Sequence, residues 1–175
     1  MEVLTDMDIM SKIGFGGSCH WCTEAIFQSL KGVTKVQQGW IASEGDAASF
    51  SEAVIVSFDE DVISLQTLIA IHLHTHSCTS MHNMRSKYRS AIYTFNDNQI
   101  GPAREAIEIL QKEFDDTIIT VVIPFIDFKL NTEDYLSYYY SNPQKPFCEI
   151  VVGPKLRLLL QNFSNHVDMN KVEVL

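Results

Sequence analysis

The sequence has few basic residues and no long apolar run. Its 13 lysine and arginine residues are outnumbered by 22 aspartate and glutamate residues, which gives a formal net charge of −9. This balance argues against a surface for nucleic acid or for an anionic membrane. No apolar run approaches the length that crosses a bilayer. The N-terminus is acidic rather than basic, so we expect no signal or transit peptide and a cytoplasmic location.

Cysteine is also scarce, and no internal repeat, low-complexity segment or linker divides the chain. The four cysteines are irregularly spaced. This pattern indicates redox chemistry or spectator thiols rather than a disulfide scaffold. With 175 residues, 46% of them hydrophobic, the chain is long enough to bury a sizeable core. We expect a single domain over residues 1–175, with a tail over 165–175 that frays.

Strand and helix patterns alternate irregularly along the chain. A first strand is expected to end near Phe15. Four later segments carry alternating or continuous apolar residues and are expected strands: 33–40, 52–58, 91–95 and 118–123. Five positions begin a helical pattern: Trp21, Ser64, Pro102, Asn131 and Pro154. This order predicts an α+β fold, a two-layer sandwich with helices packed on a mixed sheet and a ferredoxin-like core.

The most informative stretch runs from Gly14 to Phe27 and reads GFGGSCHWCTEAIF. Its glycines permit a sharp turn after a strand, and helical spacing begins at Trp21. Cys19 is therefore expected where a strand gives way to a helix, beside backbone N–H groups and the positive end of a helix dipole. This setting favours the thiolate, which is the nucleophilic form. A buried structural cysteine is the alternative, but the glycines and the helix start favour a reactive one.

Two interpretations fit this stretch. Cys19 and Cys22 form a C-x-x-C pair, as in thioredoxin-type oxidoreductases. The whole stretch, however, resembles the signature of the class A peptide methionine sulfoxide reductases, with Ser18 in place of a glycine and His20 in place of a phenylalanine. Later residues match further motifs of that family in the same order: Glu52, His76, Thr79, Tyr88, Arg89, Ser90, Phe128, Glu133, Asp134, Tyr135, Asn142, Pro143, Phe147, Cys148, Pro154 and Lys155.

The resemblance implies thiol-dependent reduction of the S-epimer of methionine sulfoxide, free or in peptides and proteins, through a cysteine sulfenic acid. Cys19 would attack the sulfur, Glu52 in its neutral form would supply a proton, and Tyr88 would donate to the oxygen. Cys148 is the first choice for the thiol that resolves the sulfenic acid, and Cys22 is the second. Thioredoxin or a small thiol would then reduce the disulfide.

Four other residues are expected to shape the substrate site. Trp21 would form an apolar wall against the substrate methyl group, and His20 stands where an aromatic ring normally makes that contact. Phe50 would give Glu52 apolar surroundings, and Asn83 replaces an aspartate of the family. The loop before Glu52 is shorter than in the family and lacks one of the two tyrosines that usually bond the sulfoxide oxygen.

His72, His74 and His76 alternate, with Cys78 beyond them, a pattern that can bind zinc. Only His72 and His76 share a face of the expected helix. We therefore interpret the group as solvated imidazoles at a helix end, with His76 held by its local turn, and expect neither a metal nor a cofactor.

Two other functions are left open by the sequence. One is a catalytically degenerate module that binds methionine sulfoxide or thioether peptides without turnover. The other is a general C-x-x-C thiol–disulfide oxidoreductase. In every case we expect a monomer without a nucleic-acid or membrane partner.

Overall fold

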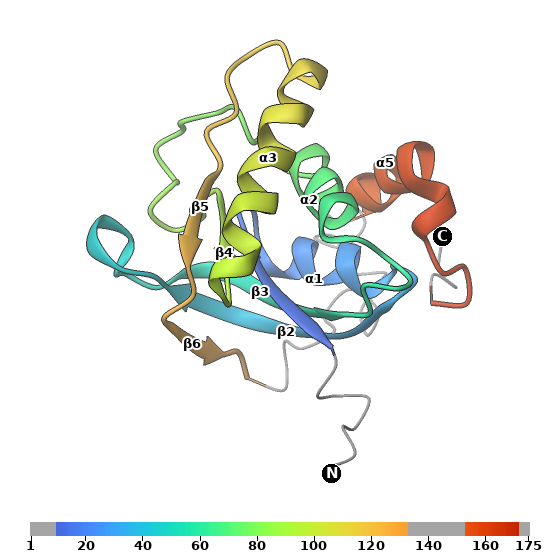
Figure 1. Ribbon diagram of the computed structural model, residues 1–175, viewed down its shortest axis with the longest axis horizontal. Helices are drawn as coiled ribbons and strands as arrows, with labels where there is room; N and C mark the ends of the chain where they lie inside the picture. The colour runs from blue at the N-terminus through green and yellow to red at the C-terminus, as the bar shows by residue number, and fades with distance from the viewer. Residues whose placement is uncertain (1–9, 133–152, 172–175) are drawn as a thin grey trace.

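The fold is given by a computed structural model that describes residues 10–132 and 153–171 (Figure 1). Its six-stranded sheet has the order β5-β4-β1-β3-β2-β6. The strands are β1 (Ser11–Gly16), β2 (Val33–Ala42), β3 (Ser51–Phe58), β4 (Ala91–Thr94), β5 (Val121–Pro124) and β6 (Asp127–Leu130). The α-helices are α1 (His20–Gln28), α2 (Leu65–His74), α3 (Ile100–Leu110) and α5 (Gly153–Phe163). The 3₁₀ helices are η1 (Gly45–Ala47), η2 (Asp97–Gln99), η3 (Gln111–Glu113) and η6 (Ser164–His166).

The expected ferredoxin-like core is confirmed. The chain runs β1-α1-β2-β3-α2-β4, and these four strands lie in the order β4-β1-β3-β2 with antiparallel neighbours. β6 adds an antiparallel strand beside β2, and β5 adds a parallel strand beside β4, which makes the sheet mixed. β1 lies inside the sheet, so the turn that follows it is anchored to a strand paired on both edges.

The helices cover one face of the sheet, and this two-layer arrangement is visible in Figure 1. Residues of α1, α2, α3 and α5 join apolar residues of β1, β3 and β4 in one buried cluster. Phe15 and Phe27 stack in it with ring centroids 4.7 Å apart, which fixes α1 on the strand that precedes it. The other face carries a smaller cluster centred on Ile41, Ile55 and Tyr93. The α+β sandwich follows from burying these apolar faces.

The structure differs from the sequence-based prediction near the ends of the sheet. β6 was not predicted, because four half-exposed residues leave little periodic signal. The strand expected over 118–123 is instead β5, since the N–H groups of Ile118 and Ile119 bond to Gln111 and Cys78 outside the sheet. Pro124 is the last residue of β5, and a proline is tolerated there because β5 is an edge strand. Most of the helix expected over 131–140 lies outside the described residues.

The C-terminal segment up to residue 171 packs against the end of α1, and the rest of the tail that was expected to fray lies outside the described residues. Val167 forms a β-bridge with Leu30, and Lys171 Nζ donates to the carbonyls of Leu30 and Val33 at 3.0 Å each. The segment therefore covers the end of α1. Within the two described ranges, no helix combines the length and the hydropathy of a membrane span.

Candidate active site

Cys19 lies in the turn between β1 and α1, as predicted, and is the N-cap residue of α1. The turn depends on Gly17, whose φ of 147° is rarely adopted by residues with a side chain. A Cβ on Gly17 would also lie 2.5 Å from Cδ2 of the His76 ring. The glycine therefore lets the turn pass directly over this imidazole and presents the Cys19 thiol at the start of the helix.

The surroundings of Cys19 favour its thiolate. The side chain of Cys22 donates a hydrogen bond to the Cys19 sulfur, and this is the largest cause that lowers the pKa of Cys19. The N–H groups of Trp21 and Cys22 also face the sulfur and lower this pKa, although neither makes a cap hydrogen bond of normal geometry. Burial and the nearby Glu52 act in the opposite direction. The net shift is downward, as the position at a helix N-terminus predicts.

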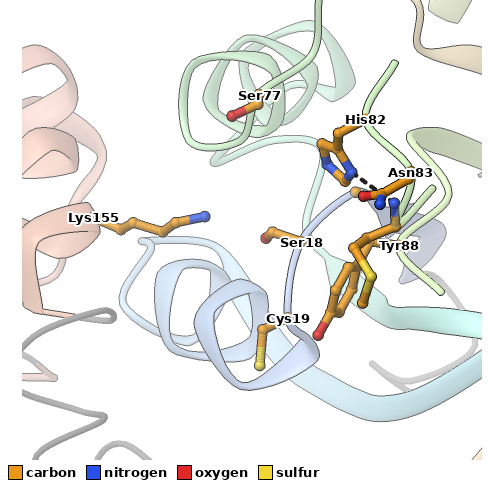
Figure 2. A pocket seen from close by; sticks show the side chains of 9 residues that line it. Ser18, Cys19, Ser77, His82, Asn83, Tyr88 and Lys155 are labelled. Carbon is orange, nitrogen blue, oxygen red and sulfur yellow. Dashed lines mark hydrogen bonds between the residues drawn. The ribbon is translucent and has the colours of Figure 1, made fainter. Parts of the chain in front are cut away.

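A cavity of about 500 Å³ opens beside the partly exposed Cys19 (Figure 2). Its described lining consists of Gly17, Ser18, Cys19, Ser77, His82, Asn83, Met84, Tyr88 and Lys155. Tyr88 projects from the loop before β4, and its hydroxyl points toward the side chain of Cys19 in Figure 2. The structure thus brings together three residues that were predicted to share a site, Cys19, Tyr88 and Asn83. A thiol and a phenolic hydroxyl group face the same cavity.

The loop that carries Tyr88 is held by Arg85. Its guanidinium donates to the carbonyls of Ser80, Ser77 and Tyr88, at 2.8, 2.5 and 2.9 Å. The same group donates to the carbonyl of Gly17 at 2.8 Å, which joins the loop to the turn before Cys19. A planar guanidinium suits several carbonyls at once, because its five N–H groups point in fixed directions. Arg85 therefore positions both walls of the cavity.

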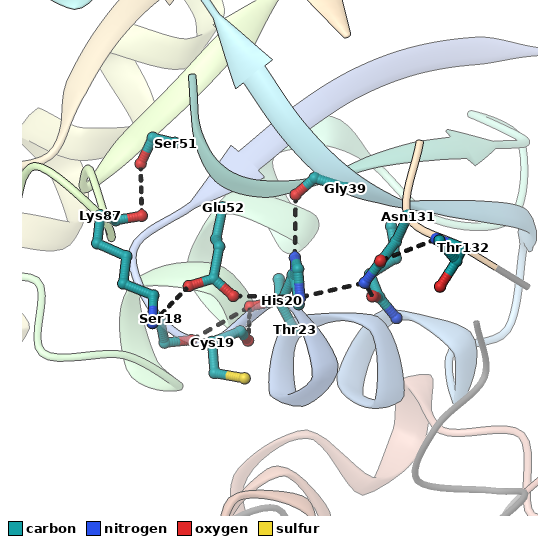
Figure 3. A network of polar contacts seen from close by, with 11 residues as sticks. Ser18, Cys19, His20, Thr23, Gly39, Ser51, Glu52, Lys87, Asn131 and Thr132 are labelled. Carbon is teal, nitrogen blue, oxygen red and sulfur yellow. Dashed lines mark hydrogen bonds and ion pairs between the residues drawn. The ribbon is translucent and has the colours of Figure 1, made fainter. Parts of the chain in front are cut away.

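Glu52 lies at the start of β3, close to Cys19, and is not among the residues described as lining the cavity (Figure 3). Its carboxyl group is buried, with only 6% of the residue exposed. Oε1 is 3.1 Å from Nε2 of His20, and Oε2 is 3.9 Å from Nζ of Lys87. The buried Oε2 makes no hydrogen bond among the described residues. One carboxyl oxygen thus lies against a histidine, and the other has Lys87 as its nearest charged neighbour.

Three predicted substrate-binding residues take other positions. His20, the first residue of α1, is buried, with 4% exposed, and does not belong to the described cavity lining. The half-buried Trp21 is also outside that lining. Phe50 is 45% exposed, so it does not give Glu52 the apolar surroundings that we expected. The polar groups of His20, from α1, and of Lys87, from the loop before β4, lie beside the carboxyl group instead.

Of the two candidate resolving thiols, Cys22 lies beside Cys19. It is buried in α1, and its side chain contacts the Cys19 sulfur. The N-cap residue and the third helical residue lie on the same side of a helix, which explains the contact. Cys148 lies outside the described residues. Cys78 is buried, and burial raises its pKa, which disfavours its thiolate.

Two of the three histidines in the pattern, His72 and His76, pack inside the fold and are not solvated as we had expected, whereas His74 is partly exposed. His72 is only 2% exposed, and its Nε2 donates to the carbonyl of Gly16 at 2.8 Å. The ring of His76 stacks on it with centroids 4.2 Å apart, donates from Nδ1 to the His72 carbonyl and accepts from Ser90 at 2.8 Å. Burial lowers the pKa of both rings, that of His76 to about 4. The pair supports the turn from below as neutral imidazoles.

Three contributors to the site were missed by the sequence reasoning. Arg85 and Lys87 stand in a polar loop without periodicity, where a basic residue is normally a solvated surface charge. Lys155 carried no predicted role, yet its ammonium donates to the Thr75 carbonyl at 3.1 Å and lines the cavity. No local signal could have found these residues, because each has a partner at least 35 positions away that only the fold brings near.

Comparison with known proteins gives one consistent result. The family described as "Peptide methionine sulfoxide reductase" matches residues 11–167. Peptide methionine sulfoxide reductase MsrA of Deinococcus radiodurans is 34% identical over 167 residues, which cover 86% of this chain and 81% of that protein.

Solved structures show the same fold. Reduced Mxr1 from Saccharomyces cerevisiae superposes with a TM-score of 0.72 at 22% identity, covering 82% of this chain and 91% of that one. Mxr1 in complex with Trx2 gives a TM-score of 0.61 at 20% identity, with 78% and 89% covered.

Proposed function

This chain is a member of the peptide methionine sulfoxide reductase family, and we propose that it reduces the S-epimer of methionine sulfoxide with Cys19 as the nucleophile. The observation that carries this assignment is the placement of Cys19 at the N-cap of α1, on the same cavity as Tyr88 and beside the buried Glu52. Sulfoxide reduction needs a soft nucleophile, a donor to the S=O oxygen and a proton. These three groups supply them.

In the reaction that we propose, the Cys19 thiolate attacks the sulfoxide sulfur while Tyr88 donates to the oxygen. Glu52 gives a proton to that oxygen, and the oxygen passes from the methionine sulfur to the cysteine. Methionine leaves reduced by two electrons, and Cys19 is oxidised by two electrons to the sulfenic acid. The cavity is wide enough for more than a methyl sulfoxide, which supports a methionine held within a peptide.

The sulfenic acid must then return to the thiol. We propose that the Cys148 thiol condenses with it, which forms a Cys19–Cys148 disulfide and releases water. A dithiol of the thioredoxin type then reduces the disulfide and is itself oxidised. The complex of the structural relative Mxr1 with Trx2 supports this choice of reductant. Cys22 is the competing thiol because it already contacts Cys19. The monomeric state and the cytoplasmic location stay predictions.

The test is a dithiothreitol-driven assay on peptides that carry separated R- and S-epimers of methionine sulfoxide. We expect turnover of the S-epimer alone, and none by Cys19→Ser. Glu52→Gln should lower turnover by roughly 10²-fold or more, because the amide keeps the shape of the side chain but cannot supply the proton. Equal rates on both epimers would reject the epimer assignment, and an active Cys19→Ser would reject the nucleophile.

A further inference from the structure

The ring of His20 is held by three polar contacts (Figure 3). Its Nδ1 lies 3.0 Å from the carbonyl oxygen of Gly39 in β2. On the other side, its Nε2 lies 3.1 Å from Oε1 of Glu52 and 3.4 Å from Nδ2 of Asn131. Trp40 packs edge-on against the ring at a centroid distance of 5.1 Å. A buried imidazole with this many contacts has a defined orientation and a defined tautomer.

The contacts determine where the hydrogens lie. The Gly39 carbonyl can only accept, so Nδ1 carries a hydrogen. Oδ1 of Asn131 accepts from the N–H of Thr132 at 2.8 Å, which fixes the amide and turns its Nδ2 toward His20 and Gln38. Because this amide nitrogen donates, Nε2 of His20 presents a lone pair. The neutral imidazole is therefore the Nδ1–H tautomer, with Nε2 as an acceptor.

A lone pair on Nε2 has a consequence for Glu52. At 3.1 Å, Nε2 and Oε1 need a hydrogen between them, and the carboxyl group is the remaining source. The alternative arrangement, imidazolium and carboxylate, contains the same single proton, and burial of both side chains disfavours that charged form. Burial also lowers the pKa of His20, more than the attraction of Glu52 raises it. In both arrangements one proton is shared between Nε2 of His20 and Oε1 of Glu52. We place this proton on Glu52.

We propose that His20 is a positioning residue that keeps the Glu52 carboxyl group protonated for the sulfoxide at Cys19. This inference rests on the proposed function. When Cys19 attacks, the proton leaves the pair for the sulfoxide oxygen and becomes the hydroxyl hydrogen of the sulfenic acid. Glu52 is left as a carboxylate beside a neutral His20 and takes a new proton from solvent. A phenylalanine at position 20, as in the resemblance motif, has no acceptor for this role.

Two charged or chargeable groups lie near the pair. Nζ of Lys87 is 3.9 Å from Oε2 of Glu52, and Cys19 is close to the same carboxyl group. Replacing His20 by phenylalanine removes the acceptor and leaves Lys87 and Cys19 in place. The carboxyl group then has no histidine to hold its hydrogen, and proton delivery to the sulfoxide should slow.

The first experiment compares kcat/KM for the S-sulfoxide peptide in wild type and His20→Phe. We expect an approximately tenfold loss in the variant, because the acid loses the partner that holds its hydrogen. Trp40→Phe is the matched control, since it changes the packing on the ring but no hydrogen bond, and its kcat/KM should stay near the wild-type value. An unchanged kcat/KM in His20→Phe would show that His20 only packs.

The second experiment is independent of turnover and of variant folding. Nitrogen-15 NMR of the histidines in the wild-type protein should show His20 protonated at Nδ1 and bare at Nε2. Infrared difference spectra between wild type and Glu52→Gln should show the carbonyl band of a protonated carboxyl group. A His20 protonated at Nε2, or a carboxylate band for Glu52, would overturn the proposal that the shared proton lies on Glu52. If the pair is seen but no sulfoxide is reduced, the proposed function fails and the pair stands.

Discussion

Arg85 and Gly17 are 68 residues apart in the sequence, and Nη1 of the arginine donates to the glycine carbonyl at 2.8 Å. This bond connects the loop that carries Tyr88 to the turn that carries Cys19. Arg85 therefore links the position of the Cys19 thiol to that of the Tyr88 hydroxyl group.

Arg85→Ala should loosen the loop and lower the free energy of unfolding by roughly 1–3 kcal/mol, because four carbonyl groups lose a charged donor. It should also raise KM, because the loop that carries Tyr88 is then held less firmly. Arg85→Lys keeps the charge but not the planar donor, and should recover only part of both. Urea denaturation and steady-state kinetics measure these effects. Arg104→Ala, at an exposed position of α3, is the control, and equal losses in both alanine variants would contradict the interpretation.

The acidity of Cys19 should depend on Cys22. In a background of Cys78→Ala and Cys148→Ser, the alkylation rate of Cys19 should rise with pH to a midpoint below the ordinary thiol value of about 8.5. Cys22→Ala removes the thiol that donates to the sulfur and should raise the midpoint, whereas Cys22→Ser keeps a donor and should raise it less. The same midpoint in all three proteins would mean that the helix N-terminus alone activates the nucleophile.

Stability should fall on mild acidification because of the buried histidine pair. An unfolded histidine has a pKa of about 6.5, whereas burial and the nearby charges of Arg85 and Lys155 lower the pKa of folded His76 to about 4. Below about pH 6.5 the His76 imidazole binds a proton in the unfolded chain but stays neutral in the folded chain. The contribution is therefore present above that pH and is lost as the pH falls toward about 4, by an amount of the order of 3 kcal/mol.

Urea denaturation at about pH 7 and at about pH 5 measures this loss. His76→Gln retains an amide donor and an acceptor but cannot titrate, so its stability should change less between the two pH values. The partly exposed His166 provides the comparison, and His166→Gln should keep the wild-type pH dependence. An equally steep loss in His76→Gln would assign it to other groups.

Recycling of the enzyme is the prediction most exposed to failure. With thioredoxin as reductant, Cys148→Ser should reduce one equivalent of sulfoxide and then stall, while a small dithiol should restore turnover. Mass spectrometry of the oxidised wild type should find a peptide pair that joins Cys19 to Cys148. The contact between Cys22 and Cys19 gives a direct rival, because a disulfide forms only between Cα atoms within about 7 Å. A Cys19–Cys22 pair with normal turnover by Cys148→Ser would reverse the assignment.

What the sequence revealed about this site was local. The turn after β1 and the start of α1 could be predicted because glycines and helical spacing act over a few residues, and Cys19 lies between them. The partner of His20 could not, since it depends on β2 lying beside β3 with Trp40 opposite Glu52. Neighbours across strands are set by register, and a register is fixed by the burial of whole sheet faces rather than by single residues.

The position of β1 has a consequence for the mobility of the site. Gly14 is paired with Ile55 on one edge and with Tyr93 on the other, so the strand cannot leave the sheet without opening both neighbours. Backbone amides in such a strand exchange with deuterium only when the whole domain unfolds. The nucleophile therefore follows directly on the part of the chain that opens least. Substrate entry must be accommodated by the opposite wall, and the oxidised and reduced enzymes should share the same slow-exchanging amides in β1.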